Sequence, residues 1–137
     1  MRLSFYWFVL ILFMAINACA PNQLYQRKDL DAALLKYHQS FRWGRLKQAA
    51  QYVQPQLQAD FVKSWLKHWD DMELHNVEIL SLIEKENGDV VEVAIKVQWI
   101  DQTTMNLKEK ILQETWVRTK DGWLLAGPVF PKDLLNQ

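Results

Sequence analysis

Histidine and aspartate side chains form the first group in this sequence that could carry out chemistry. His68 and His75 flank Asp70 and Asp71, and imidazole and carboxylate groups can together bind a metal ion or move protons. The cluster falls where a predicted helix passes into a predicted strand, and polar residues at such junctions commonly cap and turn the chain. His38 lies at the edge of an apolar helical stripe, where a hydrogen-bonded boundary histidine is expected. No His-Glu-x-x-His pattern is present, and the sequence therefore predicts neither a metal site nor a bound cofactor.

Serine side chains that could serve as nucleophiles lack the sequence context that would activate them. Ser40, Ser64 and Ser81 stand outside any Gly-x-Ser-x-Gly pattern. The chain has 4 glycines, each at a predicted turn or helix end, so no glycine-rich phosphate loop is expected. These patterns favour a protein without enzymatic activity.

Four residues on two predicted strands form a candidate ligand pocket. Trp99 and Trp116 lie on neighbouring strands, and Gln113 and Thr115 place polar groups on an otherwise apolar face. Such a mixture is typical of a pocket for an apolar or sugar-like ligand. Tryptophans at strand spacing also pack into ordinary aromatic cores, and the sequence favours that interpretation.

The single cysteine, Cys19, follows an N-terminal segment with the features of a secretory signal. The segment has a basic residue, Arg2, then an apolar run over 5–16, then small residues next to the cysteine. The apolar run is shorter than the roughly 20 residues that span a bilayer. An uncleaved anchor, a secreted protein cut after Ala18 or Ala20, and a free cysteine are the alternatives.

Residues 16–19 resemble the lipobox of bacterial lipoproteins, with Ile16, Ala18 and Cys19 matching it and Asn17 departing from it. The resemblance implies that the Cys19 sulfur carries a diacylglyceryl group and that the chain is cut before it. Several acyl chains anchor a protein stably, so the membrane is an expected partner. Because Ala20 is not aspartate, the resemblance favours the periplasmic face of the outer membrane within the bacterial cell envelope. The expected division is a signal peptide over 1–18, a lipidated cysteine and polar tether over 19–28, and one domain over 29–137.

Composition excludes some classes of protein. The 16 basic and 16 acidic residues balance, and no basic excess points to nucleic acid. Half of the residues are hydrophobic, which is ample for one core. No cysteine follows Cys19, so burial rather than disulfide bonds must hold the domain together.

Hydrophobic periodicity predicts helices followed by antiparallel strands. Apolar residues recur at helical spacing in the first half of the domain, and alternation with a period of two begins after Met72. Asn87-Gly88 and Asp121-Gly122 are predicted hairpin turns. The last residues could form a short extra strand or a flap. The predicted helices cover 29–43, 45–53 and 56–70, and the predicted strands cover 75–85, 91–99, 107–120 and 123–126.

This order of elements, together with the run over 114–125 (a strand, a Lys-Asp-Gly turn, a tryptophan and an aliphatic strand), resembles the nuclear-transport-factor-like fold. The resemblance implies an α+β cone, shared with ketosteroid isomerase, in which a curved antiparallel sheet wraps around N-terminal helices. A cystatin-like fold is the runner-up. Enzymes of this fold place an aspartate, histidine or tyrosine in the pocket of the cone, and no catalytic motif of theirs matches here. The expected function is a non-enzymatic binding or assembly module with an envelope protein partner. The alternative is a small-ligand carrier or an enzyme that uses the pocket.

Overall fold

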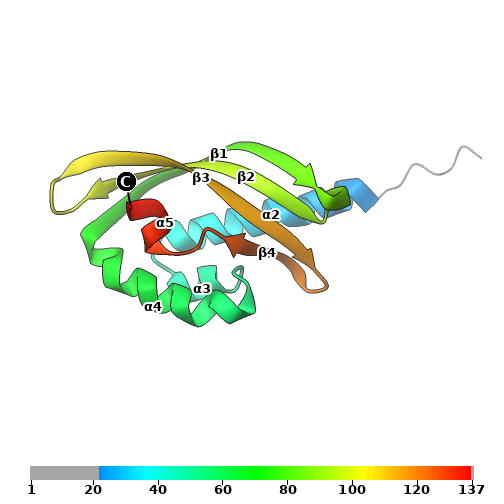
Figure 1. Ribbon diagram of the computed structural model, residues 1–137, viewed down its shortest axis with the longest axis horizontal. Coiled ribbons are helices and arrows are strands. Elements are labelled where there is room, and N and C mark those ends of the chain that lie inside the picture. Colours follow the sequence, from blue (N-terminus) through cyan, green and yellow to red (C-terminus); the bar gives the residue numbers. More distant parts are fainter. Residues whose placement is uncertain (1–21, 137) are drawn as a thin grey trace, which may run out of the picture.

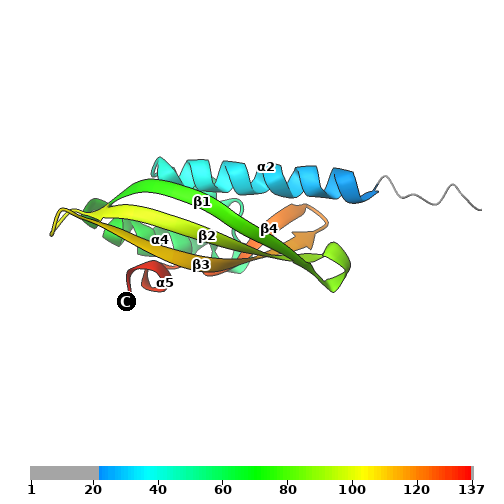
Figure 2. The same cartoon turned by 90° about the horizontal axis from the view of Figure 1, so that it is seen from above.

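A computed structural model describes residues 22–136, which fold into helices packed against one face of an antiparallel sheet. Strands β1–β3 form the upper layer in Figure 1, with α3 and α4 below them. Helix α2 runs lengthwise beside the sheet, in contact with β1 and β4 (Figures 1 and 2). Within 22–136, no helix has the length and apolar character needed to cross a membrane. The expected order of helices and strands is confirmed.

The helices are α2 (Asn22–Arg42), α3 (Leu46–Ala50), α4 (Gln58–His68) and α5 (Pro131–Leu135). Helix α2 begins at Asn22, so it includes most of the segment predicted as a tether. The apolar stripe begins only at Leu30, but lysine, arginine and glutamine before it have good helix propensity and can extend the helix without an apolar stripe. The C-terminal segment forms α5 instead of a strand or flap, because Pro131 suits the first helical position and Asp133 caps the helix.

The sheet has four strands in the order β1-β2-β3-β4, each antiparallel to the next. Two register shifts interrupt the pairing of β1 with β2, one between Leu74 and Asn76 and the other between Ile79 and Ser81. A parallel bridge between Val53 and Leu125 ties the segment after α3 to β4. The strands are β1 (Met72–Lys85), β2 (Val90–Asp101), β3 (Asn106–Thr119) and β4 (Gly122–Gly127).

The hairpin turns fall where the sequence predicts them. Between β1 and β2, Asn87 has φ 57° and Gly88 has φ 86°. These left-handed values suit asparagine and glycine, which is why this pair connects two strands so effectively.

Alternation along the strands divides the sheet into two faces. The odd-numbered residues Val91 to Trp99 of β2 are all buried against the helices, and Trp116 of β3 is fully buried on the same face. The central side chains of the helical layer, Leu34 and Phe61, pack in this core. The opposite face of β1–β3 has no helix over it in the described part of the chain (Figure 2).

Candidate functional site

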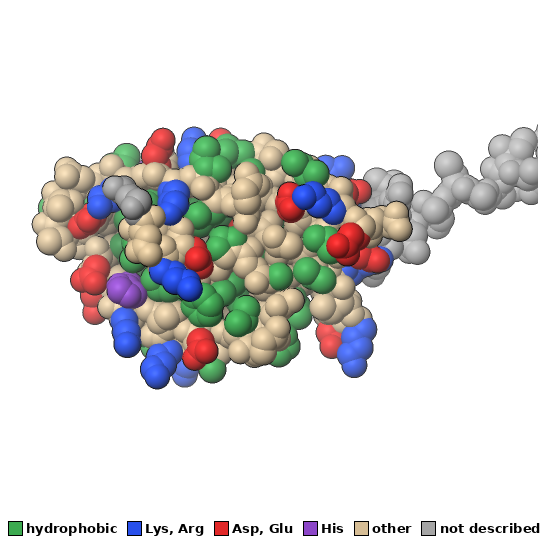
Figure 3. All heavy atoms as spheres, viewed as in Figure 1, with side chains coloured by type: hydrophobic (Ala, Val, Ile, Leu, Met, Phe, Trp, Pro, Cys, Tyr) green, Lys and Arg blue, Asp and Glu red, His purple; other side chains and the backbone are tan. Residues whose placement is uncertain are grey.

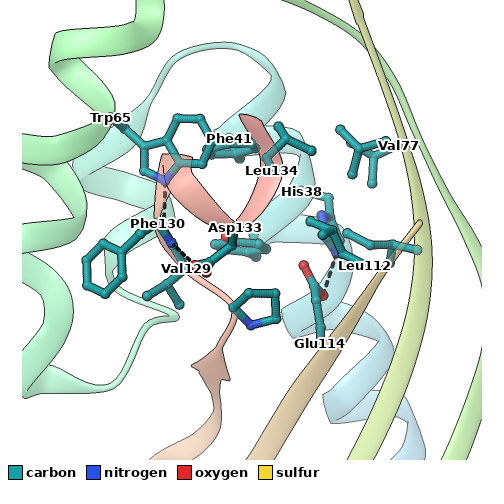
Figure 4. A pocket seen from close by; sticks show the side chains of 14 residues that line it. His38, Phe41, Trp65, Val77, Leu112, Glu114, Val129, Phe130, Asp133 and Leu134 are labelled. Atoms are coloured by element: carbon teal, nitrogen blue, oxygen red, sulfur yellow. Dashed lines mark hydrogen bonds and ion pairs between the residues drawn. The ribbon is translucent and has the colours of Figure 1, made fainter. Parts of the chain in front are cut away.

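A small cavity lies inside the domain, between α2, the inner face of the sheet and the C-terminal segment. Its volume is about 30 Å³, enough room for water but far less than pockets for small molecules usually have. Figure 4 shows the side chains around it. The lining residues are Tyr37, His38, Phe41, Trp65, Val77, Ile95, Val97, Leu112, Glu114, Pro128, Val129, Phe130, Asp133 and Leu134.

Glu114 is the buried charged residue of this cavity, with 3% of its surface exposed. It lies on the inner face of β3, directly across from Val93 of β2. The Trp116 indole donates a hydrogen bond to Glu114 Oε2 at 2.9 Å. A buried carboxylate needs such donors, because leaving it unpaired is costly. The strand period of two therefore places an acidic group and its donor together in the core.

His38 of α2 is the second polar group of the cavity. Its Nε2 lies 3.2 Å from Glu114 Oε2, within ion-pair distance (Figure 4). The same nitrogen is buried and lacks a well-aligned hydrogen bond among the described residues. An imidazole and a carboxylate at this distance can exchange a proton. This pair is the arrangement in the domain best suited to acid–base chemistry or to holding a polar group.

The C-terminal segment closes the cavity on its other side. The Trp65 indole of α4 donates to the Val129 carbonyl at 2.8 Å, and this hydrogen bond is buried. The Phe130 amide donates to Asp133 Oδ2 at 2.9 Å. Both contacts hold residues 129–133 beside the cavity, so the C-terminal segment forms part of its wall.

Tyr37 neighbours the pair, and its ring packs edge-on against both His38 and Trp116. Burial raises the pKa of Tyr37 well above its ordinary value of 10.0, and the nearby charge of Glu114 raises it further. The folded chain therefore keeps the phenol protonated at a pH where the unfolded chain releases the proton.

We expect this difference to appear as a loss of stability at alkaline pH. Above about pH 10, the free energy of unfolding should fall by about 1.4 kcal/mol for each further pH unit because of this one group. Tyr37→Phe removes the titrating hydroxyl and keeps the ring. Urea unfolding of both proteins from about pH 8 to 11 measures the difference, and parallel pH profiles would contradict the assignment.

The structure separates the four residues of the sequence-predicted pocket. Trp99 and Trp116 both lie on the inner face, but Trp99 is opposite Leu74 at one end of the sheet, whereas Trp116 is opposite Val91 at the other. Gln113 is exposed and Thr115 is half-buried, and both alternate with the buried side chains of β3.

None of those four residues lines the cavity around Glu114. The odd-numbered face of β3, taken in the sequence as the apolar one, is the outer face. Leu112 and Trp116 lie two residues before and after Glu114, so all three side chains share the even-numbered face of β3. These apolar neighbours are the pattern in the sequence that could have indicated a buried Glu114.

The remaining candidates lie away from the cavity. His68 ends α4, Asp70 and Asp71 form the short 3-10 turn Trp69–Asp71, and His75 is exposed on β1. Within the described residues, no three metal-ligating side chains come together. Cys19 lies outside the described residues.

Comparison with known proteins gives a structural match. No protein-family model and no curated protein matches this chain. A solved ketosteroid isomerase-like protein from Erwinia carotovora atroseptica SCRI1043 is similar, with a TM-score of 0.57 and 14% identity over 78% of this chain and 93% of that chain. The intermembrane space region of the chloroplast protein ARC6 has a TM-score of 0.45 and 11% identity over 77% of this chain and 95% of its own. The first likeness confirms the predicted fold class: the chain has an α+β fold like that of a ketosteroid isomerase-like protein.

Proposed function

We propose that this protein is a lipid-anchored binding or assembly module of the bacterial cell envelope and that it has no catalytic activity. The observation that carries the proposal is the filled interior of the domain. The cavity at Glu114 measures about 30 Å³, whereas pockets for small molecules commonly measure 300–1,000 Å³. Because the domain's own side chains fill its interior, we expect a partner to bind to its outer surfaces.

The outer face of the sheet supports this proposal. Leu107 and Ile111 are exposed on this face of β3, at 60% and 58%, and Ile83 is exposed on β1. An ion pair between Lys96 and Glu78, at 2.7 Å, lies among them. A face that mixes apolar side chains with balanced charges suits contact with another envelope protein.

The anchor follows from the lipobox-like residues before Cys19. Because α2 begins at Asn22, two residues would separate the lipidated cysteine from the helix. Lipidation would therefore hold the domain close to the membrane, on its periplasmic side in the proposed outer-membrane location.

Replacing Cys19 with alanine tests the anchor. We expect Cys19→Ala to abolish labelling of the chain by a palmitate analogue and to move the protein out of the membrane fraction, because the acyl chains provide the binding energy. Asn17→Ala, which keeps the cysteine, is the matched control and should stay labelled. Survival of the label on the alanine variant would overturn the proposal.

A small-ligand carrier or an enzyme is the second candidate function, and the His38–Glu114 pair favours it. The pair is buried beside a cavity, as acid–base groups of active sites commonly are. A ligand larger than the cavity would require residues 129–135 to move away from it. Thermal-shift screening of the full chain with small molecules separates the two functions: a saturable hit lost in Glu114→Gln favours the pocket, and its absence favours the binding module.

A further inference from the structure

A shallow groove on the surface, which shares only Phe130 with the cavity at Glu114, is lined by three lysines. Its volume is about 470 Å³, and it runs between α4 and the segment that leads into α5. Lys63, Lys67 and His68 form the helical wall, and Lys132 forms the other. Figure 3 shows several basic side chains and a histidine at the lower left, with fewer acidic side chains beside them.

Few acidic side chains balance the positive charge of the lysines in the groove. Lys63 and Lys67 are four residues apart on α4, where like charges repel one another. Lys132 adds a third ammonium from a separate element, and Asp60 supplies one carboxylate among the lining side chains. None of the three lysines forms an ion pair within residues 22–136. Lysines along one helix are commonly just solvated. Here lysines from two separate elements line the same groove, which is a feature of an anion site.

Apolar surface lines part of the groove. Phe130 is half-buried and Pro131 is buried, and both lie at the wall opposite α4. The Lys132 ammonium lies 5.8 Å from the centre of the Phe130 ring. The Ser64 hydroxyl donates to the Phe61 carbonyl of its own helix, at 3.1 Å. The lysines and the His68 imidazole are therefore the groups left to attract a ligand, and the Phe130 ring offers it an apolar contact.

The two walls are fixed relative to one another. The buried hydrogen bond from Trp65 to the Val129 carbonyl joins them directly. The hydrogen bond from the Phe130 amide to Asp133 fixes the start of α5. The walls of the groove are therefore already ordered before binding, so that only the side chains that contact the ligand need to lose conformational freedom, which favours affinity.

We propose that this groove binds a small soluble anion, a phosphate or carboxylate group attached to a ring or a short apolar chain. The lysines hold the anionic group and Phe130 contacts the apolar part. This site goes beyond the proposed envelope function, and it depends neither on lipidation of Cys19 nor on the cavity at Glu114.

Phenyl phosphate is the probe, with inorganic phosphate and phenol as its two parts. Binding is measured by titration calorimetry on the full chain in neutral detergent at constant ionic strength. We expect saturable binding of phenyl phosphate that is stronger than that of either part. Absence of saturable binding, or binding of phenol as strong as that of phenyl phosphate, overturns the proposal.

Charge-removing variants locate the site. Lys67→Gln and Lys132→Gln should each weaken phenyl phosphate binding about fivefold, and the double variant about twentyfold. Lys120→Gln removes the same charge from the turn between β3 and β4 and is the matched control, with an expected change of less than about twofold. An equal loss in Lys120→Gln would show that net charge alone attracts the ligand and would overturn the site. The melting temperature of each variant without ligand confirms that it is folded.

Discussion

Trp116→Ala is expected to lower the free energy of unfolding by about 3–5 kcal/mol, the range for removing a large aromatic side chain from a core. Trp116 is fully buried and packs edge-on against Tyr37, with ring centres 5.6 Å apart. Its indole also donates to the buried carboxylate of Glu114. The substitution therefore opens a cavity and removes a hydrogen bond from a charged group, so the effect should fall in the upper part of this range. Urea unfolding at neutral pH gives the measurement.

Trp43→Ala is the matched control for this prediction. Trp43 is 70% exposed at the end of α2, so removing the same side chain there should change stability by less than about 0.5 kcal/mol. If the two variants lost similar stability, the assignment of Trp116 to the centre of the core would be wrong.

Gly44→Ala is expected to cost about 2–5 kcal/mol, for two separate reasons. Gly44 follows α2 with φ +67°, a conformation that costs an L-residue about 1–2 kcal/mol. A Cβ atom there would lie 2.8 Å from Nε1 of Trp69, and crowding of this kind costs about 1–3 kcal/mol. The Trp69 ring cannot move away freely, because it packs edge-on against Phe41 and Trp65.

Gly88→Ala separates the two contributions. Gly88 has φ +86°, and nothing lies within 4 Å of an added Cβ. This variant should therefore show the conformational cost alone, about 1–2 kcal/mol. Thermal unfolding of both variants measures the difference, and a loss at Gly44 no greater than that at Gly88 would contradict the contact with Trp69.

Local patterns in the sequence predicted most of the fold. The alternation of apolar and polar residues from Val91 to Trp99 predicted which face of β2 is buried, and Asn87-Gly88 predicted the first hairpin. Both could be predicted because each pattern lies within a few residues. The start of α2 was missed because the residues before Leu30 extend the helix by propensity and not by an apolar stripe. Helix α5 was missed because its short length gives almost no periodicity.

The candidate site could not be predicted in the same way. His38 and Glu114 come from α2 and β3, and their approach to 3.2 Å depends on how the helix lies against the sheet. Each residue alone resembles a boundary residue or a solvated strand residue. The face of β3 was also ambiguous, because Ile111 and Val117 make the outer side look apolar. Long-range packing decides which face of such a strand is buried, and the residue pattern of a single sequence does not show that packing.

The two register shifts in β1 have a consequence for behaviour at high protein concentration. β1 is an edge strand of 14 residues, and a long regular edge exposes unpaired backbone groups on which another chain can add a strand. The shifts divide β1 into the short stretches 72–74, 76–79 and 81–85. A second copy placed along this edge would meet a break in the spacing of donors and acceptors at each of the two shifts. The irregular edge therefore opposes growth of a continuous intermolecular sheet, and it protects the folded chain from aggregation where many copies are crowded together.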